Sequence, residues 1–181
     1  SAFLGASPER FLKSLLYVAG SDVVMVAVRG DHEVNEMKLA HALGVDAVFL
    51  AGPADVERAT GAAVGFAGPV GFGGRLLVDR DAASISDAIT GANQTDQHLV
   101  HVQHGRDFAG EVGELRSVRE GDACPECGSL LCLYRGIEAG HIFVLGSHYS
   151  AKMGASYLDE SGTNHPMVMG CYGIGISRTM Q

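Results

Sequence analysis

The chain has 181 residues, of which 46% are hydrophobic and 19% charged, with a formal net charge of −8. This length and composition predict a folded globular protein with a substantial core and exclude an intrinsically disordered chain. The acidic charge disfavours sequence-independent binding to nucleic acid, because such binding depends on phosphate neutralisation by Lys and Arg. No run approaches about 18 apolar residues, so we expect no membrane span. The four cysteines favour a reducing compartment, and we expect the cytoplasm.

The first hundred residues alternate between predicted helices and strands. Ser7-Pro8 predicts a helix start, continued by apolar residues up to Val18. The apolar, largely β-branched run 23–28 predicts a central strand buried on both faces. Further elements are expected as a helix with apolar spacing from Val34 to a stop at Gly44, a strand over 46–50, a helix from Pro53, a strand over 76–79, a helix over 83–89 and a strand over 98–103. This alternation predicts an α/β (α+β) fold with a mixed sheet and flanking helices.

A charged turn, Arg29-Gly30-Asp31-His32, ends the central strand. Gly30 permits a sharp turn, and either Asp31 or Asn35 can cap the helix that follows. Charged residues around one strand end are a usual place for a site in an α/β domain. The alternative is a solvated cap with a surface lysine at Lys38.

A glycine-rich stretch occupies residues 61–74, with Pro69 among six glycines. Such spacing lets backbone approach a ligand closely, but it matches neither a phosphate loop nor a dinucleotide fingerprint. A flexible surface loop is the alternative.

From residue 111 to 128 the composition becomes polar, which indicates a boundary. Cys124 and Cys127 form half of a zinc knuckle, and since a structural zinc site needs four ligands we predict no metal, with these two as weak candidates. Apolar runs at 130–134 and 142–145 follow. Runs 155–158 and 167–169 flank a turn at 159–162 and predict an antiparallel hairpin.

Three stretches resemble bacterial-type prolyl-tRNA synthetase. Residues 135–146 (RGIEAGHIFVLG) and residues 169–178 (MGCYGIGISR) are similar to its catalytic core, the latter to the third class II signature. Residues 29–38 (RGDHEVNEMK) resemble the signature of the editing domain that this family carries as an insertion, and Gly91-Ala92-Asn93 fits the same insertion. The resemblance covers essentially the whole chain.

The resemblance implies two parts. Residues 1–115 would form a YbaK-like editing domain, an aminoacyl-tRNA deacylase. Residues 116–181 would form an antiparallel part of the class II core. The first two class II signatures and an anticodon-binding domain have no counterpart, so we expect a fragment. Its parent would be a homodimeric proline–tRNA ligase that uses ATP and Mg²⁺ to attach proline to tRNA(Pro).

The resemblance also implies roles for individual residues. Editing would depend on Lys38, with Asp87 and His98 beside the pocket. Substrate binding would involve Gly65, Gly68, Pro69, His32 and Asn93. Remnants of the ATP and proline sites would be Glu138, His141, Gly173, Gly175 and Arg178.

The implied reaction is hydrolysis of mischarged alanyl-tRNA(Pro), without a cofactor. A proline pocket also admits alanine, because binding rejects a smaller apolar side chain by only about 1–3 kcal/mol. The partners would be the tRNA(Pro) acceptor end and the rest of the synthetase chain, with no membrane. The alternative is a non-catalytic module that binds the acceptor end.

Overall fold

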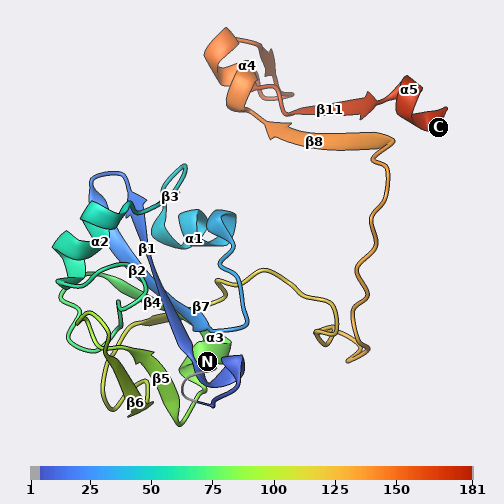
Figure 1. Cartoon of the computed structure of the whole chain (residues 1–181). Coiled ribbons are helices and arrows are strands. Elements are labelled where there is room, and N and C mark those ends of the chain that lie inside the picture. Colours follow the sequence, from blue (N-terminus) through green and yellow to red (C-terminus); the bar gives the residue numbers. More distant parts are fainter. Residues whose placement is uncertain (1–4, 181) are drawn as a thin grey trace. The chain divides into compact units, whose positions relative to one another are not determined.

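The computed structural model describes residues 5–180 and divides into two compact units (Figure 1). The first unit ends at Arg119 and the second begins at Glu120. Within the described range, every helix is too short or too polar to cross a membrane.

The first unit is built on a five-stranded mixed sheet with strand order β3-β1-β2-β4-β7. Strand β1 runs antiparallel to β2 and β3, whereas β2, β4 and β7 are parallel. The elements in chain order are η1 (Pro8–Arg10), β1 (Leu12–Ala19), β2 (Asp22–Arg29), α1 (Glu36–Leu43), β3 (Phe49–Leu50), α2 (Pro53–Thr60), β4 (Leu76–Asp79), α3 (Arg80–Ala83), β5 (Ala88–Gly91), β6 (His98–Val102) and β7 (Glu111–Gly113). Strands β5 and β6 form a separate antiparallel pair. The predicted mixed α/β architecture is confirmed.

Strand β2 is the central strand, as predicted, and residues 25–28 are completely buried. Met25 and Ala27 belong to one apolar cluster, whereas Val24, Val26 and Val28 belong to another. Figure 1 shows α1 and α2 on opposite sides of the β1–β2 ribbon. Alternate residues of β2 therefore pack into two cores, which explains why its sequence lacks a polar face.

The helix predicted from Ser7 to Val18 is wrong. Only a 3₁₀ turn follows Ser7, and the apolar residues form β1, which pairs along its whole length with β2. Gly20, at a φ of 63°, lies in the tight turn between the two strands. Residues 11–18 have spacing that suits either a helix or a half-buried strand, and the adjacent buried strand decides in favour of pairing.

The remaining predictions of the first unit hold in part. Helix α1 begins after Asn35, whose Oδ1 accepts a hydrogen bond from the Lys38 backbone N–H at 3.1 Å, and it ends at left-handed Gly44. The strand expected over 46–50 is reduced to β3. The helix expected over 83–89 is wrong, because Asp79 caps a short helix that begins earlier and residues 88–91 pair with β6.

The second unit consists of small antiparallel pairs. Its elements are β8 (Gly140–Gly146), α4 (His148–Met153), β9 (Ser156–Leu158), β10 (Asn164–Pro166), β11 (Met169–Ile174) and α5 (Ile176–Thr179). Strand β8 pairs with β11 and β9 with β10, so the predicted hairpin around 159–162 forms, but its second strand precedes the predicted 167–169. The 130–134 run contributes only an isolated bridge between Leu130 and Ala123.

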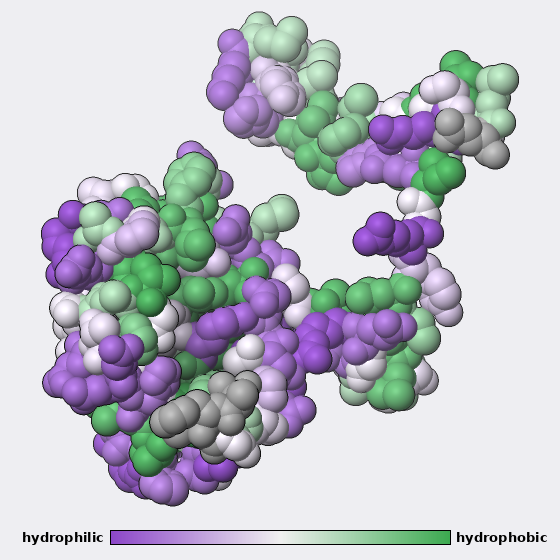
Figure 2. Space-filling view, viewed as in Figure 1, coloured by the Kyte–Doolittle hydropathy of each residue, from purple (hydrophilic) through white to green (hydrophobic). Residues whose placement is uncertain are grey.

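Many apolar side chains of the second unit are exposed, as the green atoms in Figure 2 illustrate. Val144, Tyr172 and Ile174 are each at least 75% exposed. A globular domain normally packs such residues against a further layer.

Candidate functional site

A cavity of about 500 Å³ opens beside β1 in the first unit. Strand β3 pairs with β1 only at Tyr17 and Val18, and residue 89 of β5 forms an isolated bridge with Phe11, the residue before β1. The edge of β1 between these points is open. The cavity is lined by Pro8, Phe11, Leu12, Lys13, Ser14, Leu15, Gly30, Val64, Gly65, Ala67, Thr90, Gly91 and His98.

The open edge offers backbone groups that the sheet does not use. The Leu12 carbonyl accepts a hydrogen bond from Thr90 Oγ1 at 3.2 Å, and the Leu16 carbonyl accepts one from the Ala51 N–H at 2.8 Å. Backbone direction repeats every two residues in a strand, so the Ser14 N–H and C=O face the same edge. An unpaired strand edge can bind an extended polar group by main-chain hydrogen bonds.

Two basic side chains line the cavity. Lys13 lies 2.9 Å from Glu33 through Nζ and Oε1, with 29% of its side chain exposed. The ring of His98 meets the ring of Phe66 edge to face, with centroids 5.8 Å apart. Lys13 was missed by the sequence reasoning because residues 8–18 were expected to form a helix. Strand β1 carries one charged residue, Lys13, in an otherwise largely apolar run, and that pattern is the signal for Lys13.

The glycine-rich stretch contributes a wall of the cavity through Gly65 and Ala67. Gly68 and Pro69 are buried beside this wall but do not line the cavity. Asn93 does not line it either, since its side chain binds the backbone of this stretch. Gly65 and His98 are therefore the predicted editing-site residues that the cavity brings together.

Lys38 lies away from this cavity. It lies on α1 and lines a separate shallow depression with Met37, His41 and Glu114. Its Nζ donates a hydrogen bond to the Arg116 carbonyl at 3.0 Å. Lys13 therefore lines the cavity beside β1 and Lys38 does not, and the catalytic role expected of Lys38 stays a prediction.

Asp87 also lies outside the cavity lining, on the segment that precedes β5. Its Oδ1 lies 2.7 Å from His101 Nδ1 and its Oδ2 lies 2.6 Å from the Arg10 guanidinium. The hydrogen bond from His101, followed by the charge of Arg10, lowers the pKa of this carboxyl group. Asp87 is therefore a half-exposed carboxylate held by an arginine and a histidine outside the cavity lining.

His32 is completely buried and lies behind the cavity wall at Gly30 instead of lining it. Its Nδ1 has no hydrogen-bond partner and lies 3.6 Å from Asp81 Oδ2. Burial, with a contribution from Arg29, lowers the pKa of His32. His32 is therefore a buried residue outside the cavity lining, and its expected role in substrate binding stays a prediction.

His32, Asp79 and Asp81 are the one group of potential metal ligands within 4.8 Å of one another in the described part of the chain. Asp79 already accepts backbone hydrogen bonds from Asp81, Leu115 and Arg116. Asp81 pairs with Arg116 at 2.8 Å. Because the carboxylates already have these partners, we interpret the group as a tie between the 30–33 turn and the 115–119 segment.

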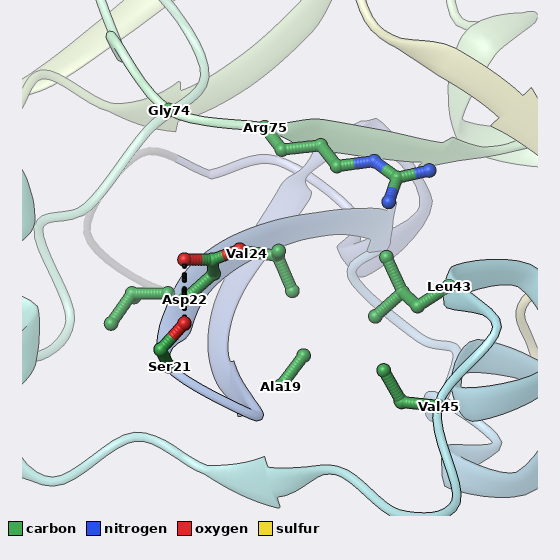
Figure 3. A pocket seen from close by; sticks show the side chains of 9 residues that line it. Ala19, Ser21, Asp22, Val24, Leu43, Val45, Gly74 and Arg75 are labelled. Atoms are coloured by element: carbon green, nitrogen blue, oxygen red, sulfur yellow. Dashed lines mark hydrogen bonds between the residues drawn. The ribbon is translucent and has the colours of Figure 1, made fainter.

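A second hollow, of about 450 Å³, lies at the β1–β2 turn (Figure 3). Leu43, Val45 and Ala19 point toward one another there. Its arginine, Arg75, makes two hydrogen bonds to Glu111, at 2.8 and 2.9 Å. This hollow therefore combines an apolar floor with a paired arginine, and the residues that line it include none of the predicted editing-site residues, whereas Gly65 and His98 line the cavity beside β1.

In the second unit, the predicted synthetic-site residues lie around one end of the β8–β11 pair. His141 pairs in register with Gly173, and its Nδ1 lies 3.0 Å from Glu138 Oε1. The Gly175 N–H donates to the Ala139 carbonyl at 2.8 Å, and Arg178 follows on α5. Cys124 and Cys127 are free thiols, and neither belongs to a group of three potential ligands among the residues described.

The fold and the cavity define a class of protein: a mixed α/β domain with a small pocket beside an open strand edge. Residues 1–108 match the family described as the aminoacyl-tRNA editing domain, and the chain therefore belongs to that family. It is 49% identical to proline–tRNA ligase of Thermoanaerobacter sp. (strain X514), over 98% of this chain and 32% of that protein. The same ligase of Pelotomaculum thermopropionicum is also 49% identical, over 98% and 32%. The chain thus spans about a third of the length of these relatives.

Solved structures share the fold. One, described as a proposed trans-editing enzyme for prolyl tRNA synthetase, superimposes with a TM-score of 0.57 at 21% identity, covering 65% of this chain and 76% of that one. A hypothetical protein of known structure gives a TM-score of 0.55 at 24% identity, covering 64% and 80%.

Proposed function

We propose that the first unit hydrolyses the ester bond of mischarged alanyl-tRNA(Pro), as the editing domain of a proline–tRNA ligase in the cytoplasm. Membership of the aminoacyl-tRNA editing family and the similarity to proline–tRNA ligases support this function. The observation that carries it is the cavity beside β1, which combines apolar walls, an open backbone edge and the Lys13 cation.

In this proposal the alanyl ester enters beside β1 and water attacks its carbonyl carbon. Negative charge then develops on the carbonyl oxygen, and a positive group nearby stabilises that charge more than it stabilises the neutral ester. Lys13 supplies the positive charge. The Ser14 backbone N–H and C=O provide a donor and an acceptor for the aminoacyl group at the open edge.

The walls of the cavity select the side chain. Leu12, Val64 and Ala67 surround the space beside Gly65 and Gly91. An alanine methyl group fits such a space, whereas a pyrrolidine ring adds atoms that press on close-packed backbone. His98, whose ring meets that of Phe66 edge to face, forms a further part of the wall.

The second unit serves ligation in the proposed complete enzyme. Glu138, His141, Gly173, Gly175 and Arg178 would contribute to the ATP and proline sites there. That reaction would use ATP with Mg²⁺ and the remaining segments of a homodimeric synthetase, whereas editing as proposed uses water and no cofactor.

The test is discharge of alanyl-tRNA(Pro) and prolyl-tRNA(Pro) by the chain, with release of the amino acid as readout. We expect alanine to be released and proline to be retained. Binding of tRNA without release of alanine would instead support the alternative, a module that holds the acceptor end without cleaving it.

A further inference from the structure

Asn93 lies just after β5 and holds the glycine-rich stretch in place. Its Oδ1 accepts a hydrogen bond from the Gly68 N–H at 2.8 Å. Its Nδ2 donates to the carbonyls of Gly68 and Val70 at 3.0 and 2.9 Å. Its backbone N–H donates to the Phe66 carbonyl at 2.9 Å. The side-chain amide therefore satisfies backbone groups of Gly68 and Val70 that the sheet leaves unpaired.

The backbone of Asn93 is also specialised. Its φ is 54°, in the left-handed region where Asn is tolerated better than most residues. This conformation directs the amide back toward residues 66–70. A residue that cannot adopt it would lose the geometry as well as the side chain.

The backbone of the glycine-rich stretch packs directly against the backbone of β5. A Cβ added to Gly68 would lie 1.8 Å from the Gly91 carbonyl oxygen, and a Cβ added to Gly91 would lie 2.3 Å from the Phe66 and Ala67 oxygens. Gly91 and Ala67 both line the cavity. The width of the cavity at this wall is therefore set by the backbone contacts between residues 66–68 and Gly91, and the hydrogen bonds of Asn93 maintain these contacts.

We propose that Asn93 is a positioning residue that sets the discrimination between small aminoacyl groups and the pyrrolidine ring. The inference rests on the proposed editing function and concerns the same cavity. Asn93 acts through the wall at Ala67 and Gly91 and does not line the cavity itself. Loss of the Asn93 side-chain hydrogen bonds lets the wall formed by Ala67 and Gly91 move outward. The cavity then holds the alanyl group less well and admits the pyrrolidine ring of proline.

Two variants distinguish the contribution of the Asn93 side chain from that of its backbone conformation. Asn93→Gly retains the left-handed φ and removes all three side-chain hydrogen bonds. Asn93→Asp retains the acceptor for the Gly68 N–H but places a carboxylate against two carbonyl oxygens. The control is Asn35→Gly, which removes the side-chain cap of α1 and leaves the cavity untouched.

The measurements are the rates of discharge of alanyl-tRNA(Pro) and prolyl-tRNA(Pro), with amide hydrogen exchange of residues 66–70. For both Asn93 variants we expect the alanine-to-proline rate ratio to fall at least tenfold and exchange at Gly68 to accelerate at least tenfold. For Asn35→Gly the ratio should equal that of the wild type. A residue important only for stability would lower both rates together and keep the ratio.

A wild-type ratio in both folded Asn93 variants would overturn the proposal, as would unchanged exchange at Gly68. If one variant fails to fold, the other decides. If the wild type releases neither amino acid, the proposed function is refuted, and the discrimination proposal is refuted with it. The exchange rates then still report whether Asn93 holds the stretch.

Discussion

Substitution of Lys13 by Ala tests which lysine supports the proposed hydrolysis. Two unit charges about 4 Å apart interact by about 4 kcal/mol at an effective dielectric constant of about 20. Lys13 is 29% exposed and its oxyanion partner carries charge only in the transition state, so we expect a loss of about 1.4–2.7 kcal/mol. This loss corresponds to a reduction of about 10- to 100-fold in the rate of alanyl-tRNA(Pro) discharge.

Lys38→Ala is the matched control, because it removes the same charge from α1, outside the cavity. Its discharge rate should stay within about twofold of the wild type. Both variants should retain the thermal midpoint within about 4 °C, since a partly exposed lysine contact contributes about 0–1 kcal/mol to stability and 1 kcal/mol shifts the midpoint of a chain of this size by about 2–4 °C. The rates are compared at saturating tRNA. A large loss with Lys38→Ala and none with Lys13→Ala would refute the reasoning from the cavity.

Four further predictions concern the first unit. Asp79→Ala leaves three backbone N–H groups without their acceptor, so it should lower the free energy of unfolding by about 3–5 kcal/mol in urea titration, whereas Asp79→Asn, which keeps an acceptor oxygen, should lose less. Because burial lowers the pKa of His32 below that of the unfolded chain, stability should decline as pH falls through about 6.5, and a His32→Gln variant, followed by circular dichroism, should lack this decline. Asp31 has its pKa lowered by the hydrogen bond from Arg29, so a second loss should begin only below about pH 4 and should persist in His32→Gln. Gly68→Ala should displace the glycine-rich stretch, raise amide exchange at residues 66–70 and reduce alanine discharge, and an unchanged exchange pattern would contradict the close packing against Gly91.

The sequence by itself determined the elements that local chemistry specifies. The continuous apolar run of β2 can only be buried on both faces, because it has no polar side to present to water. The C-terminal end of helix α1 at Gly44 was predicted, and Asn35 was one of two candidate N-caps, because such residues satisfy free backbone groups locally. The family was also recognisable, because its motifs are short contiguous stretches.

The features that depend on pairing between segments far apart in the sequence could be read only from the tertiary structure. The apolar spacing of residues 11–18 suits either a helix or a strand. Pairing with β2 decides in favour of a strand, and as a result the Lys13 side chain lines the cavity. Lys38, five residues from Glu33 in the sequence, lies outside the cavity, whereas Lys13, twenty residues before Glu33, pairs with it. The resemblance over residues 29–38 had suggested Lys38, and only the folded structure shows that Lys13 lines the cavity instead. The cavity itself exists because β3 and β5 each cover only one end of β1, and the length of an uncovered strand edge is a property of the assembled sheet that no local pattern encodes.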